Sequence, residues 1–199
     1  MTPAHRARLL RRGLQLEYLT LVWNFVGTAI AITAGISAHS VALAGFGLDS
    51  AIEIAASLIV IWHLRGIHNG RERTALRSIS IAFFALAAYV SVQSAGALWF
   101  GMRPGASLCG MVWLALTCAA MLALSAGKHV TGTQLGNQVL RTEARVTLVD
   151  AWLAGSVLLG MALNARFGWW WADPAAGFVI VFYGIVEGRH AWVEANAPR

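Results

Sequence analysis

Three acidic residues stand inside long apolar stretches of this sequence, where acids are rare. Asp49 and Glu53 are four residues apart in the segment GFGLDSAIEIAAS (45–57), and Asp150 lies in the segment TLVDAWLAGS (147–156). A separation of four residues places two side chains on the same face of an α-helix. Carboxylates gathered in an apolar setting bind cations or exchange protons, and this is the chemistry that these residues predict.

These acids need a partner of opposite charge. An ionised side chain at the centre of a membrane helix costs about 2.5 to 3.5 kcal/mol. No Lys or Arg lies in the middle of any apolar stretch, and Arg145 is five residues from Asp150, a separation that suits no pairing on a helix face. Protons or a bound cation therefore remain to neutralise the acids. If protons alone do so, the acids are only hydrogen-bonded to Ser, Thr or backbone groups.

The elements that position these acids are predicted to be membrane helices. The chain of 199 residues is 58% hydrophobic, and its mean hydropathy is +0.63, so it is too apolar for a soluble domain. A helix needs about 20 apolar residues to cross the bilayer. Six stretches meet this need: 16–36, 41–63, 78–100, 108–126, 139–163 and 170–186. The expected fold is an all-α membrane protein with six transmembrane helices.

The distribution of basic residues predicts the orientation. All of the fifteen Lys and Arg residues except Arg103 and Arg166 fall on one side if both termini lie in the cytoplasm, as the positive-inside rule requires. The net charge of +6 is then a topology signal, and no nucleic-acid partner is expected. We expect a basic N-terminal segment over 1–15, a transmembrane domain over 16–188 and a short cytoplasmic tail over 189–199, in an inner or plasma membrane.

The predicted depths bring the acids to one level. Asp49 is about 12 Å below the outer end of its helix, and Asp150 is about 16 Å above the inner end of its own helix, at 1.5 Å per residue. Small residues such as Gly45, Gly47 and Ala154 surround the acids and favour close helix packing. The second and fifth spans are therefore expected to pack tightly with their acids facing each other.

The chain resembles the transmembrane domain of the cation diffusion facilitator family of metal exporters. The features that carry the resemblance are the six spans, Asn24 in the first, SVALAGFGLDSAIEIAASLIVI (40–61) in the second, Asp150 in the fifth, and WADP (171–174) opening the sixth. The resemblance implies a transport site for a divalent, zinc-like cation, formed by Asp49, Glu53 and Asp150. It further implies export in exchange for protons and suggests a homodimer.

The sequence departs from the family at one ligand position, because the first site position of the fifth span falls on Val146. Three carboxylates without imidazole or thiolate resemble a site for a harder cation, or one completed by water. Glu143 is seven residues before Asp150, on nearly the same face, and is a further metal-ligand candidate. The alternative is that Glu143 is a solvated residue near Arg141 and Arg145.

The sequence therefore predicts a proton-coupled exporter of divalent cations that is not an enzyme and has no resident cofactor. The predicted substrates are a divalent metal ion and protons. The alternative is a degenerate family member that does not transport and acts as a membrane accessory protein. This alternative is motivated by Val146.

Overall fold

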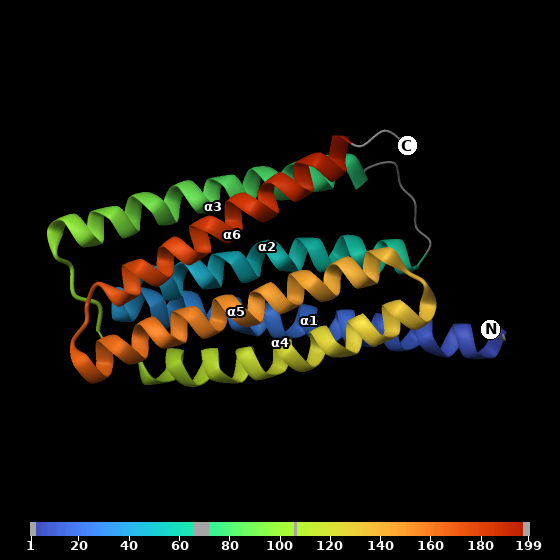
Figure 1. Ribbon diagram of the computed structural model, residues 1–199, viewed down its shortest axis with the longest axis horizontal. Helices are drawn as coiled ribbons and strands as arrows, with labels where there is room; N and C mark the ends of the chain where they lie inside the picture. The colour runs from blue at the N-terminus through green and yellow to red at the C-terminus, as the bar shows by residue number, and fades with distance from the viewer. Residues whose placement is uncertain (1–2, 66–71, 106, 197–199) are drawn as a thin grey trace.

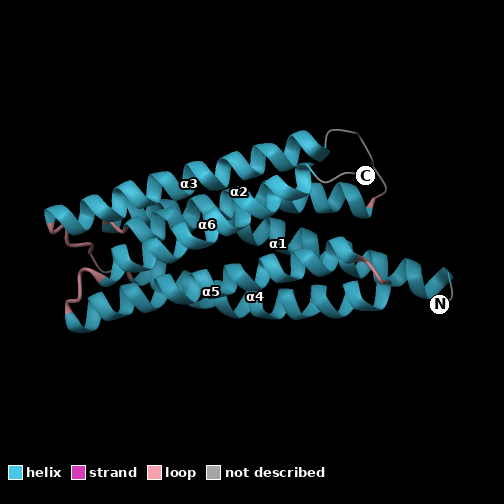
Figure 2. Ribbon diagram, turned by 45° about the horizontal axis from the view of Figure 1, so that its top comes forward, coloured by secondary structure: helices cyan, strands magenta, loops and turns pink. Residues whose placement is uncertain are grey.

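The computed structural model describes residues 3–65, 72–105 and 107–196, and these residues form a bundle of long α-helices (Figures 1 and 2). The helices are α1 (Pro3–Ala38), α2 (Val41–Leu64), α3 (Glu72–Phe100), α4 (Leu108–Leu135), α5 (Gln138–Phe167) and α6 (Ala172–Asn196). No strand occurs among the described residues. The all-α expectation is confirmed.

Each expected span lies within one of these helices, except that Trp170 and Trp171 precede α6. Several helices extend well beyond the expected ends, and α4 continues to Leu135 rather than ending near residue 126. The described ends of the chain lie at the same end of the bundle (Figure 1). Within the described residues, five helices contain a stretch long and apolar enough to cross a membrane, and α6 is not among them.

The outer surface of the bundle is apolar. Large hydrophobic side chains are exposed along the helices, and Trp99, for example, is 86% exposed. Buried polar and charged residues are instead found on all six helices, in the interior. Apolar side chains on the outer surface, with the buried charged residues facing the interior, are the arrangement expected of helices surrounded by hydrocarbon.

The helices pack mainly in pairs: α3 with α6, α4 with α5, and α1 with α2. The α1–α2 pair is tight because Gly35 and Gly47 let the two backbones approach; a Cβ atom on Gly47 would lie 2.9 Å from the backbone nitrogen of Ile32. By contrast, α2 contacts α5 over only a short stretch. Gly47 thus serves packing against α1, whereas Gly45 faces Val90 of α3 and Ile180 of α6.

Short, capped connections hold the helix ends. Ser107 caps α4 by accepting a hydrogen bond from the backbone of Gly110, and Asn137 caps α5 through Leu140. Gly136 ends α4 in the left-handed conformation, with φ of 63°, which glycine adopts without steric penalty. The tight turn at 136–137 makes α4 and α5 antiparallel neighbours.

Asp173 joins the start of α6 to the start of α2. Its carboxylate accepts hydrogen bonds from the Ser40 hydroxyl at 2.5 Å and from the backbone of Ala42 at 3.5 Å. The N-terminus of a helix has unpaired N–H groups and a partial positive charge, so a carboxylate is stabilised there. The acid of the WADP segment therefore binds the N-terminus of a different helix.

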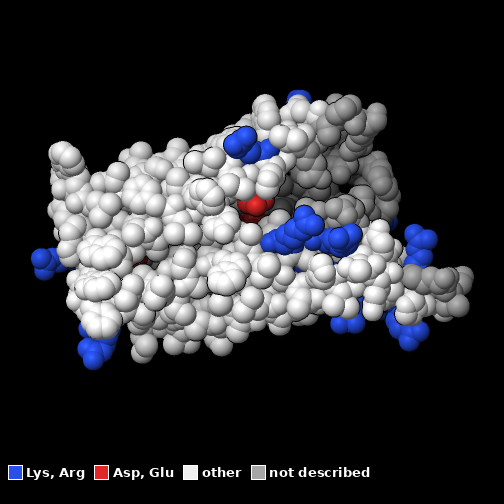
Figure 3. All heavy atoms as spheres, viewed as in Figure 1, with Lys and Arg blue, Asp and Glu red and all other residues white. Residues whose placement is uncertain are grey.

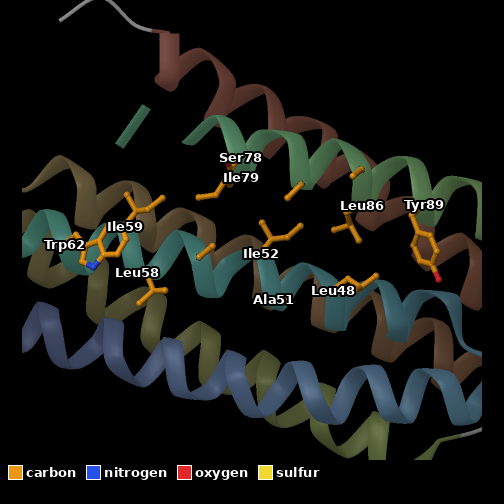
Figure 4. A pocket seen from close by; sticks show the side chains of 13 residues that line it. Leu48, Ala51, Ile52, Leu58, Ile59, Trp62, Ser78, Ile79, Leu86 and Tyr89 are labelled. Atoms are coloured by element: carbon orange, nitrogen blue, oxygen red, sulfur yellow. The ribbon is translucent and has the colours of Figure 1, made fainter. Parts of the chain in front are cut away.

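An apolar groove separates α2 from α3 (Figure 4). Its volume is about 750 Å³, and its walls are residues such as Leu48, Ile52 and Ile79. None of the described residues that line it is acidic. Because Asp49 and Glu53 are buried elsewhere on α2, this helix presents an apolar face to the groove and an acidic face to the bundle interior.

Candidate cation site

The acids Asp49, Glu53 and Asp150 come together in the bundle interior. One carboxylate oxygen from each residue lies within 4.8 Å of the others. The side chains are buried, with 4%, 6% and 0% of the residue exposed, respectively. The structure thus brings together the three acids that the sequence pattern selected, from α2 and α5.

The local sequence explains this meeting. Asp49 and Glu53 are one turn apart on α2 and share a face. On α5, Asp150 is followed by Ala151 and Ala154, which are buried and small. Small residues leave space for the carboxylates where α2 and α5 approach each other.

The carboxylates differ in their hydrogen bonding. Asn24 on α1 donates a hydrogen bond from Nδ2 to Glu53 Oε2, at 3.0 Å. Neither carboxylate oxygen of Asp150 has a hydrogen-bond partner among the described residues. A buried polar group without a partner is unfavourable, more so if it is charged. Asp150 is therefore the member of the site that most needs a proton or a cation.

The spread of the three oxygens suits a cation. Metal–oxygen distances in proteins are about 2.0 to 2.6 Å, so two ligand oxygens on opposite sides of an ion lie about 4 to 5 Å apart. The observed limit of 4.8 Å is within this range. A cation at the centre reaches all three carboxylates with little movement of the helices.

Glu143 lies outside this group of acids. Its Oε1 atom is 3.4 Å from Nζ of Lys128, and Glu143 is buried. Glu143 therefore does not lie with the other three ligand candidates. It is also not solvated at the helix mouth, which was the alternative. Val146 is half-buried and has no side-chain atom that binds metal.

Lys128 corrects the expectation that the bundle interior lacks a basic residue. Because α4 continues to Leu135, Lys128 belongs to the helix, and it is fully buried. Its Nζ atom also lies 3.1 Å from Glu17 Oε2 and 3.0 Å from the Thr147 hydroxyl. The sequence did not reveal this cluster because hydropathy placed residue 128 in an inner loop. It did not reveal the contact of Asn24 with Glu53 because hydrogen bonds between helices leave no local pattern.

Acidic side chains contribute little to the surface. On the face shown in Figure 3, basic side chains protrude at several places, whereas most of the acidic surface lies in a recess. Glu17, Asp49, Glu53, Glu143, Asp150 and Asp173 are all buried. Most of the acidic residues therefore lie in the bundle interior, together with the buried Lys128.

Comparison with known proteins supports the membrane assignment. No protein-family model matches the chain. The chain is 22% identical to transmembrane protein 163 of Xenopus laevis over 198 residues, which cover 93% of this chain and 69% of that protein. Together with the long apolar helices, this similarity makes the chain an all-helical membrane protein that crosses the bilayer several times.

Proposed function

We propose that this protein is a membrane transporter of divalent metal cations, with its transport site at Asp49, Glu53 and Asp150. The observation that carries the proposal is the convergence of three buried carboxylates from two helices within 4.8 Å, with both oxygens of Asp150 unpaired among the described residues. Buried acids that face the interior of a membrane bundle are typical of ion pathways and proton relays.

The charge of the site favours a divalent cation in exchange for protons. Three ionised carboxylates within a few ångströms repel one another strongly in a medium of low dielectric constant. A divalent ion cancels most of this charge, and protons cancel it when the ion has left. Because ligands must lose protons to bind metal, both species compete for the same oxygens, and their exchange follows from this competition.

The donor atoms bear on the choice of metal. All three charged ligands are oxygens, and Asn24 at Glu53 adds a neutral amide. Oxygen donors suit hard cations such as Mn²⁺ and Mg²⁺, whereas Zn²⁺ is most often held by imidazole or thiolate. The site is therefore a divalent-cation site in which zinc is one substrate to test among several.

Export from the cytoplasm follows from the resemblance to the cation diffusion facilitator family, on the residues 40–61 and Asp150. The transported ion enters from the cytoplasmic side and leaves on the opposite side as α2 and α5 reorient. In this proposal, the residues that lie between α2 and α5 bind the ion, and the remaining helices provide the frame.

The test is cation transport by the full chain in proteoliposomes, across a panel of Zn²⁺, Mn²⁺, Co²⁺, Cd²⁺ and Mg²⁺. We expect uptake of at least one of these ions, dissipation of an imposed proton gradient, and loss of both in Asp150→Asn. The matched control is Asp173→Asn, which changes an equally buried acid outside the site and should retain transport in the molecules that fold.

Two outcomes would contradict the proposal. Uptake that survives Asp150→Asn, Asp49→Asn and Glu53→Gln would place the ion elsewhere. Cation binding without uptake of any ion on the panel would instead support the accessory role, in which the chain has kept a site but lost transport.

Val146→His tests the choice of metal. We expect this variant to favour uptake of Zn²⁺, because an imidazole one turn before Asp150 adds a ligand that Zn²⁺ prefers.

A further inference from the structure

The ammonium group of Lys128 occupies a position made of oxygen atoms from two other helices. Nζ contacts Glu17 Oε2 of α1 at 3.1 Å, and Glu143 Oε1 and the Thr147 hydroxyl of α5 at 3.4 and 3.0 Å. Two carboxylates and one hydroxyl are the donor types that bind small hard cations. The lysine ammonium thus stands where a free cation would be stable.

This set of oxygens is not saturated by the ammonium. Glu17 is fully buried, and its Oε1 atom has no hydrogen-bond partner in the described part of the chain. The ammonium therefore leaves one carboxylate oxygen of the set without a partner among the described residues.

The Lys128 cluster adjoins the cation site because both are built on the same helices. On α5, Thr147 is one turn before Asp150, about 4.5 Å along the axis, and Glu143 is one turn further back. On α1, Glu17 is seven residues before Asn24, which binds Glu53, so the two point in nearly the same direction. The oxygen-bearing side chains of the two clusters therefore follow one another along α5.

We propose that Lys128 is a resident cation that fills a second oxygen-lined cation site, formed by Glu17, Glu143 and Thr147. By filling it, the lysine confines the transported ion to the site at Asp49, Glu53 and Asp150, so that one divalent ion binds per chain. The confinement of the transported ion rests on the proposed function. The occupation of the second site by the Lys128 ammonium does not.

The same arrangement blocks one route through the bundle. A free cation that left Asp150 along α5 toward the inner end would meet the fixed positive charge of Lys128 within about two turns. A tethered ammonium cannot move on with the ion, so it acts as a barrier on this side. The transported ion is thereby kept to a path that does not pass between α1, α4 and α5.

The experiment compares the number of ions that bind to the full chain in detergent and to three variants, with Mn²⁺ and Zn²⁺ as probes in equilibrium dialysis. We expect one ion per chain in the wild type and in Lys128→Arg, which keeps the charge. Lys128→Ala should bind two ions. The triple variant Lys128→Ala, Glu17→Gln, Glu143→Gln should return to one, because the second site has lost its acids.

A second measurement needs no divalent metal. Methylammonium, added at increasing concentration, should raise the melting temperature of Lys128→Ala in a saturable manner by restoring an ammonium group among the three oxygens. The wild type and the triple variant should not respond. If Lys128→Ala is unstable alone, the variant is purified in methylammonium, and its melting temperature is measured after methylammonium has been removed.

The outcomes separate the two proposals. A wild type that binds no divalent ion contradicts the proposed function, while methylammonium rescue of Lys128→Ala would still support a second cation site. A wild type that binds one ion and a Lys128→Ala variant that binds one or none would overturn the confinement by Lys128. Absence of methylammonium rescue would overturn the filled second site itself.

Discussion

Two clusters of buried acids lie next to each other in this bundle, and they differ in one respect. Glu17 and Glu143 share a lysine, with Nζ 3.1 and 3.4 Å from their oxygens. Asp49, Glu53 and Asp150 have no basic residue within ion-pair distance among the described residues. Lys128 thus forms direct ion pairs with one cluster only. In the proposed function, the other cluster is neutralised by the transported cation or by protons.

Burial of an acid is therefore not by itself a sign of function. All five residues are buried acids in apolar helices, and the identity of their neighbours alone distinguishes them. An internal ion pair is costly to break but adds little net stability, because the desolvation of both charges offsets their attraction. An uncompensated cluster has a free energy that depends on its ligand, and such dependence is what transport requires.

The largest expected effect comes from removing the lysine. Lys128→Met should destabilise the protein by about 3 to 5 kcal/mol, because it leaves buried acids without their partner. The measurement is the melting temperature in detergent. The triple variant Lys128→Met, Glu17→Gln, Glu143→Gln should regain most of the loss, since no charge remains unpaired. If the triple variant is less stable than the single one, the cluster is not held together by charge.

The second effect concerns the uncompensated cluster. Asp150→Asn should weaken divalent cation binding by more than about 100-fold, which exceeds the effect of changing residues that only support ligands. Its counterpart in the other cluster, Glu143→Gln, should lower the melting temperature and leave the cation affinity nearly unchanged. Calorimetric titration of both variants with the cation measures these affinities. Equal losses of affinity would mean that the two clusters form one site.

A smaller effect is expected at Asn24, which holds Glu53 from α1. Asn24→Ala should weaken cation binding about 10-fold, because residues that orient a ligand change metal affinity by about this factor. Asn164→Ala is the matched control, since Asn164 donates its hydrogen bond to the backbone oxygen of Pro104. An unchanged affinity in Asn24→Ala would show that Glu53 is positioned by α2 alone.

The smallest effect is expected at Thr147. Thr147→Val removes the hydroxyl that contacts Lys128 and should cost about 1 kcal/mol of stability, with no change in cation affinity. Thr131→Val, in which the lost hydrogen bond is to the backbone of the same helix, should cost less. A lowered cation affinity in Thr147→Val would instead indicate that Thr147 takes part in the transport site.

The candidate site was predictable to the extent that it depends on local pattern. Asp49 and Glu53 share a helix face because of their spacing, and their apolar surroundings mark them as unusual. Glu143 shows the limit of this reasoning: its spacing from Asp150 placed both on one face, but spacing does not reveal which partner stands opposite. Lys128 is 111 residues from Glu17, and no local rule connects them.

The end of α4 shows a second limit. The hydrophobic stretch ends near residue 126, but the helix continues to Leu135, because polar residues can continue a helix when other helices cover them. Asp173 is a similar case, as its carboxylate meets the N-terminus of α2. Helix length and capping partners depend on neighbours in space, whereas hydropathy reports only on the surrounding medium.

Composition and residue spacing were enough to predict long apolar helices. They also placed two acids on one face of the second helix and a third acid in the fifth. These properties follow from composition and from the 3.6-residue period of the helix, which are local. Which acids receive an internal counter-charge depends instead on how the helices pack. That choice depends on α1, α4 and α5 meeting at Lys128, and electrostatic energy in a bundle is set by distances between helices rather than by order along the chain.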